Sequence, residues 1–159
     1  MIKEYKNFLT PFECDHFIQL HFALFVPEIT RNAFFHEGTE VVALSKYNSP
    51  EIKRLTSLLN YESHKLDKRN FINYFELVKW NTNQSQGTHQ DFDYHPLTSI
   101  LYLNDDFEGG ETFVEDKIIK PKKGLMISFE GDKLKHGVKK IRKGIRYTIP
   151  CWYKRKKKL

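Results

Sequence analysis

The second half of the chain consists of short apolar runs separated by turn residues, and this pattern constrains the fold more than any other feature of the sequence. The run at 71–80 carries no helix signal, and further runs follow at short intervals. Regularly spaced short strands joined by tight turns predict a β-sandwich or a barrel. The later strands are expected at 97–103, 111–115, 124–129, 134–138 and 145–153. Turn clusters separate them, among which are Asn104-Asp105-Asp106, Gly109-Gly110, Pro121-Lys122-Lys123-Gly124 and Glu130-Gly131-Asp132.

The first half of the chain carries the helix signals. Thr10-Pro11-Phe12-Glu13 combines an N-cap threonine, a proline at the first helical position and a capping-box glutamate, so a helix is predicted over 11–24. Ser49-Pro50-Glu51 predicts the start of a second helix in the same way. Both helices are expected to support one face of a sheet, whereas 27–39 and 81–88 are predicted to be loops.

Length and composition indicate one folded domain. The chain has 159 residues, of which 40% are hydrophobic and 14% aromatic, enough to bury a core. The N-terminus lacks the apolar core of a signal peptide, and no run approaches the roughly 20 apolar residues that span a bilayer. A cytoplasmic protein without membrane contact is therefore expected. Cys14 and Cys151 stand outside any metal-type spacing and are predicted to be buried free thiols.

The net charge of +6 comes largely from one run near the C-terminus, Lys154-Arg155-Lys156-Lys157-Lys158. Residues 154–159 are predicted to form a solvated basic tail. The alternative is attraction of this tail to nucleic acid, a ribosome or an acidic peptide. The rest of the chain is close to neutral, so the fold itself is not expected to bind nucleic acid.

Three residues have the composition of a metal site. His89 and Asp91 lie two positions apart, so in an extended chain both side chains point to the same side and can reach one ion. His136 follows a turn and is the third candidate ligand. Two histidines and one carboxylate form the facial triad of non-haem Fe(II) oxygenases. This triad leaves three positions open, two for a bidentate co-substrate and one for O2.

A His-x-Asp pair by itself is a weak signal, because a histidine beside an acid is common in surface loops. His21, His36, His64 and His95 are predicted to be such surface histidines without a metal. Asp93 repeats the spacing and is an alternative ligand. Asp91 is preferred because it lies two residues from His89.

Arg146 strengthens the metal hypothesis. It follows His136 by ten residues, and strand alternation places Arg146, Thr148 and Trp152 on one face. A guanidinium can hold a terminal carboxylate by a bidentate, charge-assisted bond, and the Tyr102 hydroxyl could donate a second hydrogen bond. Iron with an arginine behind it matches 2-oxoglutarate, a dicarboxylate with one end on the metal and one on the arginine.

Together these features resemble the catalytic core of the prolyl 4-hydroxylase branch of 2-oxoglutarate/Fe(II) dioxygenases. The resemblance covers 80–153, nearly half of the chain, and the motifs agree in order and spacing. The matching motifs are His89-x-Asp91, Ile100-Leu101-Tyr102-Leu103-Asn104-Asp105, Gly109-Gly110-Glu111-Thr112, Pro121-Lys122-Lys123-Gly124, His136-Gly137-Val138, Gly144-x-Arg146-Tyr147 and Trp152-Tyr153.

The resemblance implies a mainly β fold with flanking α-helices, a double-stranded β-helix (jelly roll) with the metal at its open end. Helical N-terminal support would cover about 1–70 and the catalytic core about 71–153. Fe(II), 2-oxoglutarate and O2 are implied, with ascorbate as a further candidate. The implied reaction is hydroxylation of a prolyl residue in a peptide or protein, with release of succinate and CO2. Another residue or a free amino acid is the alternative target.

The resemblance also implies residues around the co-substrate. Members often carry a tyrosine about nine residues before His-x-Asp, where this chain has Trp80, whose indole N–H could donate instead. Thr98 is included among the co-substrate contacts, and Trp152 is expected to line the substrate pocket. A tyrosine often found three residues before the first ligand is Gln86 here, at the end of a polar loop.

Three other functions compete with this assignment. A nucleic-acid demethylase of the repair type shares the iron triad, but that branch usually carries a second arginine where this chain has Trp152. A halogenase lacks the carboxylate ligand that Asp91 supplies. A non-catalytic jelly-roll binding module does not account for an intact triad together with Arg146.

Overall fold

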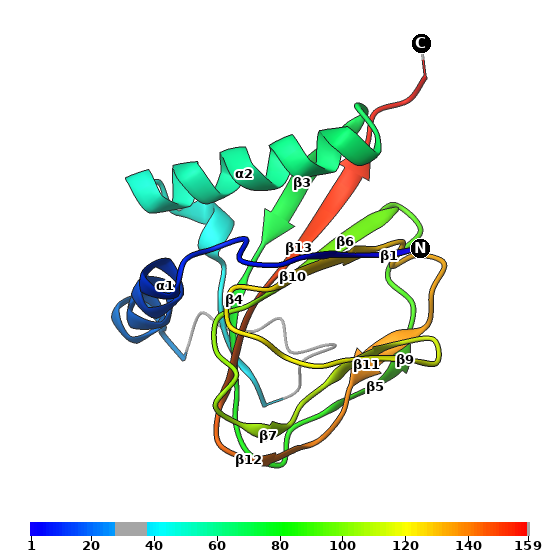
Figure 1. The fold of residues 1–159 in the computed structure, drawn as a ribbon. Coiled ribbons are helices and arrows are strands. Elements are labelled where there is room, and N and C mark those ends of the chain that lie inside the picture. Colours follow the sequence, from blue (N-terminus) through cyan, green and yellow to red (C-terminus); the bar gives the residue numbers. More distant parts are fainter. Residues whose placement is uncertain (28–37, 159) are drawn as a thin grey trace.

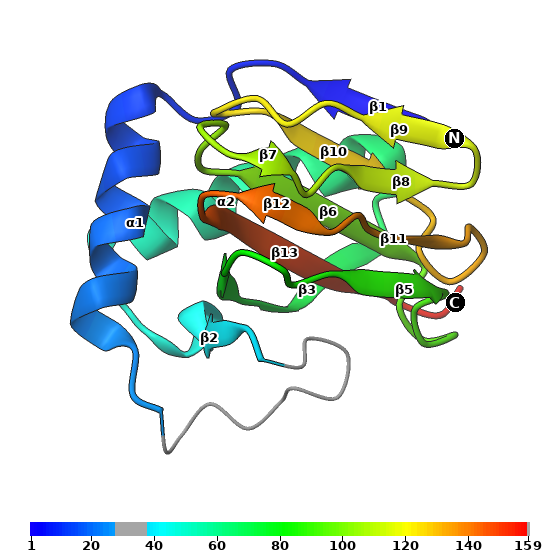
Figure 2. The same ribbon diagram turned by 90° about the horizontal axis from the view of Figure 1, so that it is seen from below.

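Two antiparallel β-sheets stacked face to face make up most of the molecule (Figures 1 and 2). The computed structural model describes residues 1–27 and 38–158. The larger sheet within these residues has the order β1 (Ile2–Tyr5), β10 (Met126–Phe129), β6 (Leu97–Tyr102), β13 (Arg146–Arg155), β4 (Leu77–Trp80) and β2 (Glu40–Val42), with β3 (Asn70–Phe75) also paired to β13. The smaller sheet has the order β5 (Gln86–His89), β11 (His136–Val138), β8 (Thr112–Val114) and β9 (Lys117–Ile119). A separate pair is formed by β7 (Glu108–Gly109) and β12 (Ile141–Lys143).

The chain passes back and forth between the two sheets. From β10 in the larger sheet it crosses to β11 in the smaller one, and it returns to the larger sheet in β13. Figure 2 shows β5, β11 and β8 lying in front of β6 and β13. This arrangement is the jelly roll predicted from the sequence, and the space between the sheets holds the candidate site.

The two predicted helices are present, α1 (Pro11–Leu24) and α2 (Pro50–Leu66), with a 3₁₀ turn at Leu44–Lys46. The capping box of α1 is formed as expected: Glu13 N–H donates to Thr10 Oγ1, and Thr10 N–H donates to Glu13 Oε1, both at 3.2 Å. Helix α2 lies across the outer face of the larger sheet (Figure 1). Its buried side chains Ile52, Leu55 and Leu59 join the main core there. Among the described residues, no helix is long and apolar enough to cross a membrane.

The strand predicted at 71–80 is interrupted at Glu76, and β13 explains the interruption. β3 pairs with the second half of β13 and β4 with the first half. One register holds from Arg146 to Trp152 and shifts by one residue between Trp152 and Tyr153. Between them Glu76 N–H donates to the carbonyl of Pro150 at 3.1 Å. In an antiparallel pair Pro150 would also donate its N–H to the Glu76 carbonyl, but proline has no N–H. The regular hydrogen bonding between the two strands is therefore interrupted there.

Several strands were not predicted from the sequence. β1 and β2 lie in the region expected to be helical support, so this region also contributes strands to the larger sheet. β7, β9 and β12 are only two or three residues long and carry no alternation of their own. The loop expected at 81–88 is wrong from Gln86 on, where β5 begins. Most of the loop predicted at 27–39 lies outside the described residues.

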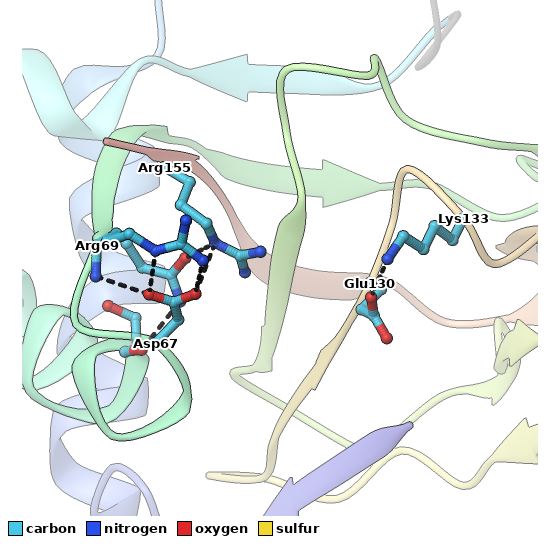
Figure 3. Close-up of polar contacts among 7 residues, drawn as sticks. Asp67, Arg69, Glu130, Lys133 and Arg155 are labelled. Carbon is cyan, nitrogen blue, oxygen red and sulfur yellow. Dashed lines mark hydrogen bonds and ion pairs between the residues drawn. The ribbon is translucent and has the colours of Figure 1, made fainter. Parts of the chain in front are cut away.

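The basic C-terminal run does not begin as a solvated tail, because β13 extends to Arg155. Arg155 Nε donates to Asn70 Oδ1 at 2.9 Å and lies 3.3 Å from Asp67 Oδ2, which also pairs with Arg69 (Figure 3). The prediction of a tail over 154–159 is therefore wrong for Lys154 and Arg155. The two cysteines are buried and free, as predicted.

Candidate metal centre and co-substrate pocket

Two neighbouring strands bring the predicted metal ligands together. β5 and β11 are antiparallel, and their register places His89 opposite His136, with ring centroids 4.3 Å apart. Asp91 follows β5, and its Oδ1 lies 3.2 Å from His136 Nε2 and 3.6 Å from His89 Nε2. One candidate ligand atom from each of the three residues lies within 4.8 Å of the others. The alternative ligand, Asp93, is exposed and outside this group.

Backbone carbonyls fix the orientation of both imidazole rings. His89 Nδ1 lies 2.9 Å from the carbonyl oxygen of Gly87, and His136 Nδ1 lies 2.7 Å from that of Leu134. A carbonyl can only accept, so in these contacts each Nδ1 carries the hydrogen and donates it. Each Nε2 then points toward Asp91. It can donate to the carboxylate while the ring is protonated, and it offers its lone pair to a metal ion when the ring is neutral.

The Asp91 carboxylate is held from the opposite side. Thr98 Oγ1 donates to Asp91 Oδ2 at 2.5 Å, which leaves Oδ1 directed at the two histidines. Burial alone would raise the pKa of Asp91, but hydrogen bonds from His136 and His89 outweigh it and hold the pKa well below its usual range. Asp91 is therefore an anion at neutral pH. Thr98 was expected to contact the co-substrate, whereas the structure places its hydroxyl on Asp91.

Arg146 lies in the same cavity, at the start of β13 and opposite Trp80 of β4. It is 1% exposed, and its Cζ lies 5.1 Å from the ring centre of Trp80 and 5.5 Å from that of Tyr102. Its Nη2 donates to Thr112 Oγ1 at 3.1 Å, and the Tyr102 hydroxyl also hydrogen-bonds to Thr112. Among the residues that the structure describes, no carboxylate lies within ion-pair distance of Arg146, and its Nε has no hydrogen-bond partner.

A buried guanidinium without a counter-ion is costly, so this pocket favours an anionic ligand. The cavity has a volume of about 300 Å³ and is lined by all three candidate metal ligands as well as by Arg146. Thr148 and Trp152 also line it, in agreement with the predicted alternation along β13. These residues therefore fit a metal-bound dicarboxylate, with one end near the His-Asp-His group and the other at the guanidinium.

Comparison with known proteins agrees with this geometry. Residues 71–154, more than half of the chain, match the 2OG-Fe(II) oxygenase superfamily. The chain belongs to this superfamily. This is the superfamily that the sequence motifs resemble, and the residues of the cavity fit Fe(II) and 2-oxoglutarate.

Prolyl hydroxylases are among the proteins that this chain resembles. Prolyl 3-hydroxylase 2 from Homo sapiens is 43% identical over 70 residues, a match that covers 39% of this chain and 10% of the human protein. The crystal structure of a Pseudomonas putida prolyl-4-hydroxylase has a TM-score of 0.80 at 15% identity, covering 98% of this chain and 93% of that one.

A second solved structure with a similar fold is the Trichoplax adhaerens prolyl hydroxylase in complex with a hypoxia inducible factor oxygen degradation domain peptide fragment. Its TM-score is 0.74 at 18% identity, with coverage of 97% of this chain and 83% of that one. At such identities, the likeness of the two solved structures establishes the jelly-roll fold.

Several histidines lie elsewhere than the sequence pattern predicted. His95 is 2% exposed, lines the cavity and hydrogen-bonds to Asn73 at 2.9 Å, so its assignment to the surface is wrong. His21 is also buried, with Nε2 2.9 Å from the carbonyl oxygen of Glu40. His64 is exposed, although on α2 rather than in a loop, and His36 lies outside the described residues. No local pattern marked His95 or His21 as buried.

Other cavity residues carried no recognisable signal in the sequence. Tyr74 and Glu76 line the cavity from β3 and from the break after it. The residues predicted to contact the co-substrate are placed as follows: Trp80 and Thr98 line the cavity, whereas Tyr102 is fully buried behind it beside Arg146.

Gly131 lies against Asp91, one of the three candidate metal ligands, where there is no room for a side chain. Its carbonyl accepts the Asp91 N–H at 2.8 Å, and a Cβ on Gly131 would clash with Asp91 Oδ2 and Thr98 Oγ1. The sequence marked this glycine only as part of a turn. Its role depends on the close approach of two segments far apart along the chain.

We expect Gly131→Ala to lower Fe(II) affinity by about 10- to 100-fold, the usual cost of disturbing a group that orients a ligand. An anaerobic Fe(II) titration in the presence of 2-oxoglutarate measures the affinity. Gly87→Ala is the matched control, because a Cβ on Gly87 meets no atom within 4 Å and the carbonyl that holds His89 remains. Equal affinities for the two variants would show that Gly131 does not position Asp91.

Proposed function

We propose that this oxygenase hydroxylates prolyl residues of a peptide or protein. In this proposal His89, Asp91 and His136 bind Fe(II), and Arg146 binds the distal carboxylate of 2-oxoglutarate. The observation that carries it is the single cavity shared by the His-Asp-His group and a buried guanidinium without a carboxylate partner among the described residues. When bound, Fe(II) and 2-oxoglutarate activate O2 to hydroxylate a substrate C–H bond, with release of succinate and CO2.

The protein's own residues position these groups. The rings of Trp80 and Tyr102 lie next to the Arg146 guanidinium, where they keep it from turning and exclude water around it. Thr112 links Arg146 to the Tyr102 hydroxyl. The carboxylate of 2-oxoglutarate would then meet a guanidinium that is already oriented, which reduces the ordering cost of binding.

Two kinds of observation favour a prolyl substrate. The relatives named above are prolyl hydroxylases, and one of them was solved with a peptide fragment bound. In the cavity, the rings of Tyr74 and Trp152 lie 4.8 Å apart on neighbouring strands. Such aromatic faces suit the packing of a pyrrolidine ring, as in other grooves that bind proline-containing segments.

We expect the protein, supplied with Fe(II) and 2-oxoglutarate, to hydroxylate members of a library of proline-containing peptides. Succinate release and a mass gain of about 16 Da on the peptide are the paired measurements, and coupling of the two identifies hydroxylation. The same peptides with alanine in place of proline are the control. The prolyl assignment fails if no proline peptide is hydroxylated while methylated nucleic acid or a free amino acid is.

A further inference from the structure

The cavity contains a buried carboxyl group that the proposed chemistry does not use. Glu76 is 7% exposed and lines the cavity at the break between β3 and β4. Its backbone N–H is bonded to the Pro150 carbonyl, which fixes it beside the middle of β13. Arg146 lies four residues from Pro150 along this strand, about 13 Å at ordinary strand rise. Glu76 and Arg146 form no ion pair, and the pKa of Glu76 is shifted by burial and not by the charge of Arg146.

The Glu76 carboxyl group has no compensating partner among the residues that the structure describes. Within residues 1–27 and 38–158, no side chain or backbone N–H donates to it and no cation lies within ion-pair distance. Burial raises its pKa to about 7. Removing this carboxylate from water costs free energy, and no contact among the described residues offsets that cost. A cationic group on a bound ligand would offset it.

Aromatic side chains surround this part of the cavity. The ring centroid of Tyr74 lies 4.8 Å from that of Trp152 and 5.8 Å from that of His95. Burial and, after it, the nearby charge of Glu76 raise the pKa of Tyr74 to about 12, while burial lowers the pKa of His95. His95 is thus neutral at pH 7. Tyr74, His95 and Trp152 line the same cavity as His89, Asp91 and His136, so this aromatic group lies near the candidate metal ligands.

Aromatic faces around a carboxylate are the combination that recognises a positively charged nitrogen. We propose that Glu76 binds a cationic nitrogen of the substrate, with Tyr74, His95 and Trp152 as the walls around it. This inference rests on the proposed function, because the same cavity would hold the target proline. Two sources offer this chemistry: the side chain of a lysine or arginine next to the proline, and the ammonium group of an N-terminal proline.

Matched peptides test the proposal. One pair differs only in the residue beside the proline, lysine or its neutral analogue norleucine. A second pair carries an N-terminal proline that is free or acetylated. We expect the wild-type protein to hydroxylate the cationic member of at least one pair with a kcat/KM higher by about tenfold or more, the range of a charge-assisted hydrogen bond. The pair that shows the preference identifies the source of the nitrogen.

Glu76→Gln keeps the size of the side chain and removes its charge, so it should bring the ratio within the preferred pair close to one. Glu76→Asp keeps the charge and should retain part of the preference. Fe(II) and 2-oxoglutarate binding by Glu76→Gln, followed by visible absorbance without O2, reports whether the metal centre is intact. If Glu76→Gln does not fold, the peptide pairs on the wild-type protein still decide the question.

Equal kcat/KM values for both members of both pairs on the wild-type protein would overturn the proposal, as would an unchanged ratio in Glu76→Gln. Hydroxylation of proline peptides without charge preference leaves the prolyl function standing and removes the role of Glu76. The opposite result is also recognisable. If no proline peptide reacts, but a cationic amine of another kind stimulates succinate release by the wild type and not by Glu76→Gln, the role of Glu76 stands and the prolyl function fails.

Discussion

His136→Ala is expected to abolish hydroxylation and to lower Fe(II) affinity by more than about a hundredfold. Loss of a group that only orients a metal ligand costs about 10- to 100-fold, so loss of a ligand should cost more. His136 is the residue through which β11 contributes to the site, with Nε2 3.2 Å from Asp91 Oδ1. Without it only His89 and Asp91 of the group remain. Anaerobic Fe(II) titration, followed by the visible charge-transfer band with 2-oxoglutarate, gives the affinity directly.

The control for this variant is His64→Ala, which makes the same chemical change at an exposed position on α2. It should bind Fe(II) like the wild type. Retention of the charge-transfer band and of full turnover by His136→Ala, at matched metal loading, would disprove the assignment of His136 as a ligand.

Arg146→Ala is expected to raise the KM for 2-oxoglutarate at least tenfold. A charge-assisted hydrogen bond contributes roughly 1.5–3 kcal/mol, and each 1.4 kcal/mol corresponds to about a factor of ten. Arg146→Lys should have an intermediate KM, because it keeps the charge but loses the planar fork that matches a carboxylate. Succinate formation at varied 2-oxoglutarate concentration measures the effect.

Tyr102→Phe is the comparison for this prediction. It removes one neutral hydroxyl that hydrogen-bonds to Thr112 beside Arg146, so its effect on the KM should be smaller. The melting temperature of each variant separates lost binding from lost folding. A wild-type KM in a folded Arg146→Ala protein would show that the co-substrate is held elsewhere.

Local patterns in the sequence were enough to predict several parts of this protein. Thr10 and Glu13 lie within one helical turn, so the capping box could be recognised from four letters. Strand alternation likewise placed Arg146 on the same face as Trp152 before the sheet was known. The spacing of His89 and Asp91, together with His136 further on, was sufficient to predict the group that the structure brings together.

Other features depend on pairing between segments that are far apart in the sequence. The shortest strands have no alternation of their own and exist because a partner strand supplies their hydrogen bonds, as β7 and β12 do for each other. His95 and Glu76 are buried because β3, β13 and the segment after Asp91 enclose one cavity. The role of Gly131 arises where its backbone touches Asp91. Burial and close approach are properties of the assembled sheets, and a polar residue or a glycine looks the same in the sequence whether it meets solvent or the wall of a cavity.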